Sequence, residues 1–420
     1  MTSARGGDLL RVIGPGLLFA GAAVGVSHLV QSTRAGAQYG LAPLGLVLLA
    51  CAMKYPAFVF GPRYAAATGR SLLWGYRARG RWAVALYAVL TLATMFAIEA
   101  AVTLVTAGLA QALIGVPVPV AWLAGAILAG SIALLVAGRY AWLDRAIKLM
   151  IALLTVSTLV ATLLVVPRLP WRTLASAPAG GFSVTDVAFA AALVGWMPSA
   201  IDIAVWSSLW TLARARQTGY RPSVREATLD FDIGYAGTLA LAVCFLLLGA
   251  GVMHSAGRTF AAAPGAFAAQ VVELYAQTLG GWSRPLLGLA AFAVMLSTTV
   301  TVVDGFPRAL AALGAVLRGR RDDEAVEGPA YWIAMAVLAV GSLLVIGPFV
   351  ARLKALVDLA TTLSFLTAPV LSTLNHLAVT GVEVPAADRP GQRLRRASLA
   401  GIALQAAFAL GYLWLRFAPA

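Results

Sequence analysis

Three side chains with ligand or proton-transfer chemistry lie in segments that are otherwise apolar. His28 lies near the start of the chain, and Met197 and Asp202 lie on either side of Pro198 near its middle. A neutral imidazole binds iron, manganese, zinc or copper, and a thioether is a softer ligand. A carboxylate can bind a cation or carry a proton. The sequence therefore predicts a site where these segments meet, with the alternative that His28 only holds unwound backbone and Met197 only fills a gap.

The segments that must position these residues are long and apolar. Hydrophobic residues make up 60% of the 420 residues and charged residues only 11%, which excludes a soluble domain. A helix needs roughly 20 apolar residues to cross the bilayer. We predict one all-α polytopic membrane domain over 1–420, with about eleven spans near 12–36, 41–62, 82–111, 118–138, 146–166, 187–211, 232–253, 284–308, 330–350, 354–378 and 398–417.

The net charge of +14 follows the loops. Most Lys and Arg residues fall on one side if the N-terminus is cytoplasmic, as the positive-inside rule requires. This predicts a cytoplasmic N-terminus, an outside C-terminus and, in a bacterium, the plasma (inner) membrane. The basic loops are suited to anionic lipid and do not indicate nucleic acid. The first span has no cleavage site before it, so we expect it to be retained.

Two spans are interrupted by small and polar residues. Gly25 and Ser27 lie inside the first span, and Pro198 and Ser199 lie inside the sixth. Polar groups at membrane depth are costly unless they face a cavity or a partner, and Pro198 removes a backbone donor. Matched breaks at the first and sixth positions predict a five-plus-five inverted repeat around a central site, as in secondary transporters. The two repeats would cover 12–166 and 187–378, with an extra helix at 398–417.

Several motifs carry a family resemblance. The first span contains GPGLLFAGA and AGAQYG, the sixth contains FSVTDVAFAAALVGWMP, and TGRSLL follows the second. These motifs, with Glu99 in the third span, resemble the Nramp divalent-metal transporters over most of the chain. The resemblance implies the LeuT-type fold and proton-coupled uptake of manganese or iron(II).

The first and third helices depart from the family where its chemistry lies. Nramp proteins break the first helix at Asp-Pro-Gly-Asn, and alignment on AGAQYG places Gly-Val-Ser-His at 25–28 there. The ligand carboxylate is therefore absent, and His28 is the candidate replacement. Glu99 matches a proton-pathway glutamate, whereas Phe96 stands where an aspartate is expected.

The sixth helix keeps part of the family pattern. Met-Pro-His becomes Met197, Pro198 and Ser199, so the resemblance implies a thioether ligand but no histidine for proton movement. The backbone carbonyl of Val194 would be a further ligand. Asp202 is the carboxylate near this break, and it could replace the lost first-helix charge or carry the coupling proton.

Other buried charges have structural alternatives. Lys54 in the second span could pair with Asp202 or with Glu99, which would leave the other carboxylate free to titrate. Asp304 and Arg308 have the spacing of an i,i+4 ion pair. Cys51 and Cys244 lie in apolar segments and suggest neither a disulfide nor a zinc site. No Walker lysine or Ser-His-Asp order is present, so neither ATP-driven transport nor an enzyme is expected.

We therefore expect a proton-linked or uniporting transporter of divalent metal, with His28 and Met197 as metal ligands. The alternatives are a transporter of an organic or anionic solute on the same scaffold, and a non-transporting membrane sensor. Convergence of His28, Met197 and Asp202 would favour metal, and an outward-turned His28 would favour an organic solute. No cofactor is expected beyond a transported metal, and the oligomeric state is left open. The candidate substrate contacts are Gly25, Ser27, His28, Val194, Met197, Ser199 and Asp202, and the proton-coupling candidates are Glu99, Asp202 and His28.

Overall fold

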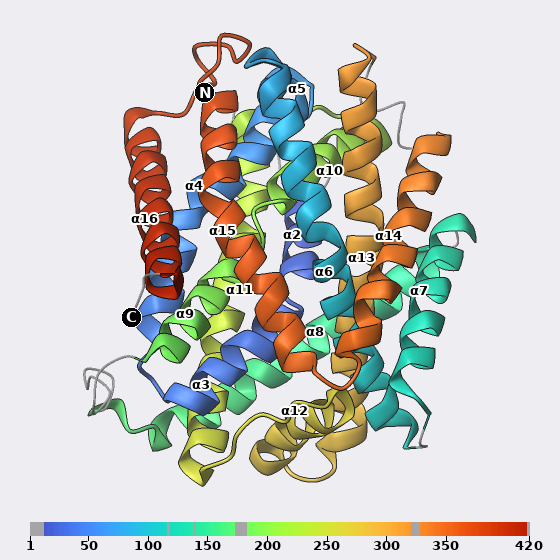
Figure 1. Ribbon diagram of the computed structural model, residues 1–420, viewed down its shortest axis with the longest axis vertical. Coiled ribbons are helices and arrows are strands. Elements are labelled where there is room, and N and C mark those ends of the chain that lie inside the picture. Colours follow the sequence, from blue (N-terminus) through green and yellow to red (C-terminus); the bar gives the residue numbers. More distant parts are fainter. Residues whose placement is uncertain (1–11, 116–117, 138–139, 173–182, 321–327, 418–420) are drawn as a thin grey trace.

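The computed structural model describes residues 12–115, 118–137, 140–172, 183–320 and 328–417, and every regular element in these ranges is a helix. Nine of the helices are long and apolar enough to cross a membrane, and the bent pair that begins the described chain makes a tenth. They form one bundle with their long axes roughly along one direction (Figure 1). The chain is therefore an integral membrane protein, as predicted.

The first five spans run from the broken helix to α8. Gly25 lies at the break, and glycine follows several of these helices, such as Gly69 after α4 and Gly115 after α6. Their bounds are α2 Pro15–Ala23, η1 Ser27–Ser32, α3 Thr33–Tyr39, α4 Leu44–Thr68, α6 Arg81–Ile114, α7 Val120–Ala137 and α8 Tyr140–Val165.

The second half of the described chain begins with a further broken helix, made of α9 Val184–Trp196 and α10 Ile203–Thr218, which is not among the ten spans counted above. The bounds of the spans that follow are α11 Val224–Leu248, α13 Ser283–Leu317, α14 Pro329–Phe349, α15 Leu353–Val379 and α16 Gln392–Phe417. Capping boxes begin α9 and α11. The Ser183 hydroxyl accepts from the Asp186 N–H and the Ser223 hydroxyl from the Glu226 N–H, and each serine N–H donates to the carboxylate of the same partner. The division into repeats at 12–166 and 187–378 stays a prediction.

Two shorter helices lie at opposite ends of the bundle. α5 Leu72–Ala78 follows α4 at the top of Figure 1, and α12 Pro264–Leu279 lies at the bottom. The sequence predicted connecting segments at both places. α12 buries Phe267 and Val271 on one side and packs against α6, so it is an amphipathic helix whose apolar stripe is too short for a span.

Glycines bring the helices of the site close together. A Cβ added at Gly195 of α9 would lie 2.0 Å from the carbonyl oxygen of Thr361 on α15, and one at Gly61 of α4 would lie 2.1 Å from that of Ala204 on α10. These positions admit no side chain while the backbones keep this spacing. Small residues therefore set the distances between α4, α9, α10 and α15, as is common in membrane bundles.

Candidate substrate site at two broken helices

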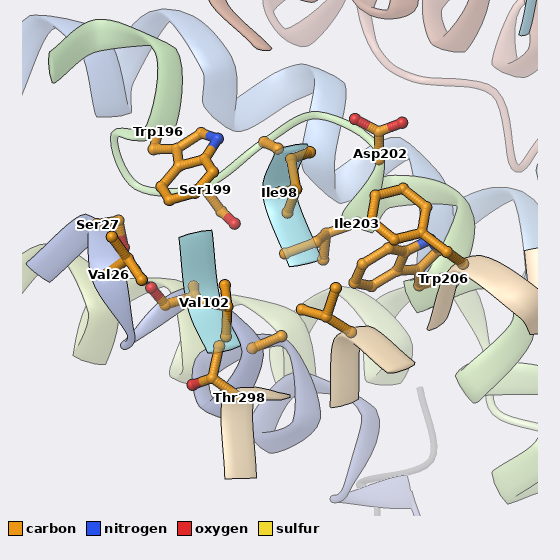
Figure 2. Close-up of a pocket in the computed structure, with 15 residues that line it drawn as sticks. Val26, Ser27, Ile98, Val102, Trp196, Ser199, Asp202, Ile203, Trp206 and Thr298 are labelled. Atoms are coloured by element: carbon orange, nitrogen blue, oxygen red, sulfur yellow. Dashed lines mark hydrogen bonds between the residues drawn. The ribbon is translucent and has the colours of Figure 1, made fainter. Parts of the chain in front are cut away.

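A pocket lies between the two breaks, closed by α6 and α13 (Figure 2). The centres of water-sized molecules fit in about 30 Å³ of it. That is room for about two waters. The lining residues are Ala22, Ala23, Val26, Ser27, Ile98, Val102, Trp196, Ser199, Ala200, Asp202, Ile203, Trp206, Thr298, Val302 and Phe306.

The first break bends the chain by 45° between α2 and the segment that begins with η1. Gly25 lies at the bend, where an added Cβ would be 2.8 Å from the Thr298 methyl carbon. The Thr298 hydroxyl donates to the Gly21 carbonyl at 3.1 Å and thereby holds α13 against α2. Glycine at position 25 is therefore required by the approach of α13, and Gly25 does not itself line the pocket.

The second break spans the residues between Trp196 and Ile203, with a cis peptide bond between Met197 and Pro198. In a continuous helix the residue at 198 would donate to the carbonyl of Val194, but proline has no N–H. The Val194 carbonyl accepts instead from the Met197 N–H at 3.3 Å, and the last carbonyls of α9 can also accept from other donors.

Lys54 of α4 supplies those donors. Its side chain is fully buried. Its ammonium nitrogen donates to the carbonyl oxygens of Val194 at 2.6 Å, Gly195 at 2.8 Å and Ser199 at 3.3 Å. A lysine ammonium has three N–H donors, and three carbonyls occupy them. The cation therefore sits at the negative end of the α9 helix dipole.

This arrangement differs from both pairings expected for Lys54. The sequence left Asp202 and Glu99 as its possible partners, whereas the structure gives backbone carbonyls instead. The physical reason is local, because unwound backbone offers acceptors that charge patterns do not reveal. The Val194 carbonyl therefore does bind a cation, but this cation is the Lys54 ammonium and not a metal ion.

Asp202 is buried and lacks a hydrogen-bond partner among the described residues. It is 2% exposed, and neither carboxylate oxygen is engaged. It precedes α10, whose N-terminus favours a negative charge. Tyr76 of α5 and Tyr87 of α6 lie within electrostatic reach of it. Of the described lining residues, Asp202 alone carries a formal charge.

His28 is held by hydrogen bonds at both ring nitrogens. Nδ1 lies 2.7 Å from the Ser27 hydroxyl, and Nε2 lies 2.9 Å from the carbonyl oxygen of Thr238 on α11. A carbonyl only accepts, so Nε2 carries a proton and donates to it. Ser27 also bonds the Ala23 carbonyl at the end of α2. His28 thus holds the first break in shape, and Ser27 reaches the pocket while His28 does not line it.

Met197 is likewise engaged elsewhere. Its sulfur accepts a hydrogen bond from the Ser32 hydroxyl at 3.5 Å, and its side chain is fully buried outside the pocket lining. Within the ranges that the structure describes, no group of three or more His, Cys, Asp or Glu side chains is placed to hold a metal ion. The proposed roles of His28 and Met197 as metal ligands stay predictions.

Glu99 lies on α6 between two lining residues, Ile98 and Val102, but is not itself part of the lining. It is fully buried; one oxygen accepts from the Thr103 hydroxyl at 2.7 Å, and the other has no partner among the described residues. Glu99 therefore keeps one free acceptor for a proton, and its coupling role stays a prediction.

Two ion pairs brace the bundle around the site. Arg308 bonds both oxygens of Asp304 at 2.9 and 2.8 Å, which confirms the predicted i,i+4 pair, and Tyr331 donates to the same carboxylate. Sequence reasoning missed the second pair, in which Arg34 of α3 meets Asp358 of α15 at 2.5 Å. An arginine near the end of the first span was the available signal.

The chain is 34% identical to the uncharacterized protein PM0681 of Pasteurella multocida (strain Pm70) over 367 residues, which are 86% of this chain and 83% of that protein. The chain belongs to the PM0681 family. It matches no protein-family model.

Solved structures give the fold of this PM0681-family chain. A manganese transporter of Eremococcus coleocola, in complex with an aromatic bis-isothiourea substituted compound, has a TM-score of 0.73 at 14% identity and covers 98% of this chain and 88% of its own. MhsT in complex with L-phenylalanine has a TM-score of 0.61 at 12% identity and covers 99% of each chain. The predicted LeuT-type fold is confirmed, and so, at the level of fold, is the resemblance to Nramp transporters.

Proposed function

We propose that this chain is a secondary transporter of a small organic solute, which binds in the pocket between α2, η1, α9 and α10. The transporter role is supported by the fold and by two unwound segments that border one buried pocket. The fold alone does not choose the solute, because similar scaffolds include both a manganese transporter and a protein solved with L-phenylalanine.

The observation that carries the choice of solute is the position of Lys54. By the Nramp resemblance the Val194 carbonyl would be a metal ligand, and here it accepts from the Lys54 ammonium at 2.6 Å. A dication about 4 Å from that ammonium would be repelled by roughly 8 kcal/mol at an effective dielectric constant of about 20. The site also lacks the first-helix carboxylate that would offset this repulsion.

The groups expected to replace that carboxylate do not compensate. The ring nitrogens of His28 bond Ser27 and the Thr238 carbonyl, and the Met197 sulfur bonds Ser32. A pocket lined mostly by apolar side chains with a few hydroxyls fits an organic solute better than a dehydrated metal ion. Glu99 and Asp202 remain the candidates for a coupling proton.

Calorimetric titration of the purified protein with Mn²⁺ tests this proposal. We expect no saturable binding in the wild type and no difference in His28→Ala or Met197→Leu. Manganese uptake into proteoliposomes should equal that of protein-free vesicles. Saturable Mn²⁺ binding that His28→Ala or Met197→Leu weakens would overturn the proposal and restore the metal hypothesis.

A further inference from the structure

The Asp202 carboxylate is a buried acidic group with no compensating partner in the described chain. Both of its oxygens are buried without a hydrogen-bond partner among the described residues, and the side chain is 2% exposed. An ionised carboxylate held out of water without a partner is strongly destabilising. Such a group persists in a pocket when its partner arrives from outside the chain, as a proton or a bound cation.

The nearby lysine does not serve as this partner. Lys54 has three N–H donors, and the carbonyls of Val194, Gly195 and Ser199 occupy them. No hydrogen bond or ion pair of the described residues joins Lys54 to Asp202. The described pocket lining therefore presents the Asp202 carboxylate as its one charged group, while the nearby Lys54 ammonium is bonded to backbone carbonyls.

Aromatic rings form part of the same pocket wall as Asp202. Trp196, Trp206 and Phe306 all contribute to this wall. The Trp206 and Phe306 rings lie edge to face, with their centroids 4.8 Å apart. Figure 2 shows Asp202 and Trp206 on one side of the pocket and Ser27 on the opposite side, with the Asp202 oxygens directed away from the Trp206 ring. Aromatic faces attract ammonium groups, and the attraction strengthens when water is excluded.

We propose that the solute carries a protonated amine, and that Asp202 binds this amine while the aromatic and aliphatic wall holds an apolar body. This inference rests on the proposed function, since it names the solute class for the same pocket. The hydroxyls of Ser27, Ser199 and Thr298 lie in the lining for further polar atoms of the solute. A solute whose only charge is a carboxylate would be repelled by Asp202.

The size of the pocket limits the solute further. The described conformation has about 30 Å³ for the centres of water-sized molecules. An ammonium head of about water size fits this space, and a branched aliphatic body of a few carbons requires the pocket to widen. Isobutylammonium is therefore a suitable probe, with isobutanol and isobutyrate as neutral and anionic analogues.

Calorimetric titration and thermal unfolding of the detergent-solubilised full chain test the inference without requiring transport. We expect isobutylammonium to bind and to raise the unfolding temperature, and isobutanol and isobutyrate to bind at least about tenfold more weakly. Asp202→Asn should weaken isobutylammonium binding about 10-fold to 100-fold, as for a lost hydrogen bond to a charged group. Asp202→Glu should retain part of the affinity.

Glu273→Gln is the matched control, because it removes an exposed carboxylate of α12 outside the pocket. It should leave isobutylammonium binding unchanged. Equal binding by wild type and Asp202→Asn, equal binding of the three head groups, or no binding of isobutylammonium would each overturn the inference. If Asp202→Asn does not fold, the head-group preference of the wild type decides. Mn²⁺ binding would instead contradict the proposed function, so the two failures are distinct.

Discussion

The Lys54 ammonium donates to the backbone carbonyls at the C-terminal end of α9 and to that of Ser199. Lys54→Met would leave the buried carbonyls of Gly195 and Ser199 without their donor, whereas Val194 would keep the Met197 N–H at 3.3 Å. The cost should be about 2–4 kcal/mol. We therefore expect a lower unfolding temperature in detergent, measured by differential scanning fluorimetry. Lys354→Met is the control, because Lys354 is exposed at the start of α15, and it should unfold close to the wild-type temperature.

The outcome for Lys54 also reports on the site. If Lys54→Met is as stable as wild type, the carbonyls of α9 have other donors and the Val194 carbonyl is open to a metal ion. Destabilisation together with stabilisation by Na⁺ or K⁺ would show that a free ion can take the vacated position.

At the residue scale, the sequence predicted which residues lie at the breaks better than what they contact. The matched polar interruptions at Ser27 and at Pro198 to Ser199 do border one pocket. The partner of Lys54 was not predictable, because the sequence shows charges but not the directions of carbonyls. The Thr238 carbonyl that binds His28 lies on α11, 210 positions away, so no local spacing could indicate it.

At the scale of elements, one ion pair joins the helices at the α12 end of the bundle. Arg34 of α3 bonds Asp358 of α15 at 2.5 Å, and its guanidinium lies 4.6 Å from the centre of the Phe189 ring on α9. Asp358→Asn should loosen this junction by about 1.4 kcal/mol, which corresponds to roughly tenfold more frequent opening. The expected result is faster access to the pocket from that end.

Cysteine labelling measures this access. In a background with Cys51 and Cys244 replaced by alanine, a water-soluble maleimide should modify Ser199→Cys faster when Asp358→Asn is added. The control is Glu273→Gln, which breaks an exposed ion pair with Arg284 at the same end. An unchanged rate in Asp358→Asn, or an equal increase in Glu273→Gln, would refute a specific role for the Arg34 pair.

The long elements were predictable because a continuous apolar run must be a helix in a bilayer. Every expected span coincides with a helix or a broken pair. The short helices α5 and α12 were not predicted, since an amphipathic helix of a few turns resembles a loop in hydropathy. The π-helical segments η1 and η4 Gly249–Met253 were also not predicted. η4 packs against α3 through Gly249 and Gly36, and this fit depends on both helices rather than on one stretch of sequence.

For the whole molecule, the orientation in the membrane remains a prediction from charge. The basic residues of the described chain concentrate at the α5 end, and few lie at the α12 end. The positive-inside rule then places α5 in the cytoplasm and the end of α16 outside. Alkaline phosphatase fused after residue 388 should be inactive, and phosphatase fused after residue 417 should be active.

Green fluorescent protein at the same two sites gives the reciprocal measurement, because it folds only when cytoplasmic. Phosphatase activity at residue 388 with fluorescence after residue 417 would invert the assignment. The predicted repeats would be unaffected by such an inversion, since they depend on the order of the helices and not on their direction.

The Lys54 ammonium is covalently part of α4, which limits the energy sources that could drive uphill transport. A dissolved co-ion enters from one side of the membrane and leaves on the other. Its movement down its own electrochemical gradient drives the solute against a concentration gradient. A cation bonded to the backbone never leaves, so it contributes no such driving force unless it exchanges its proton. Accumulation of a monovalent amine could then draw on the membrane potential, which supplies about 2.3 kcal/mol per charge for each 100 mV.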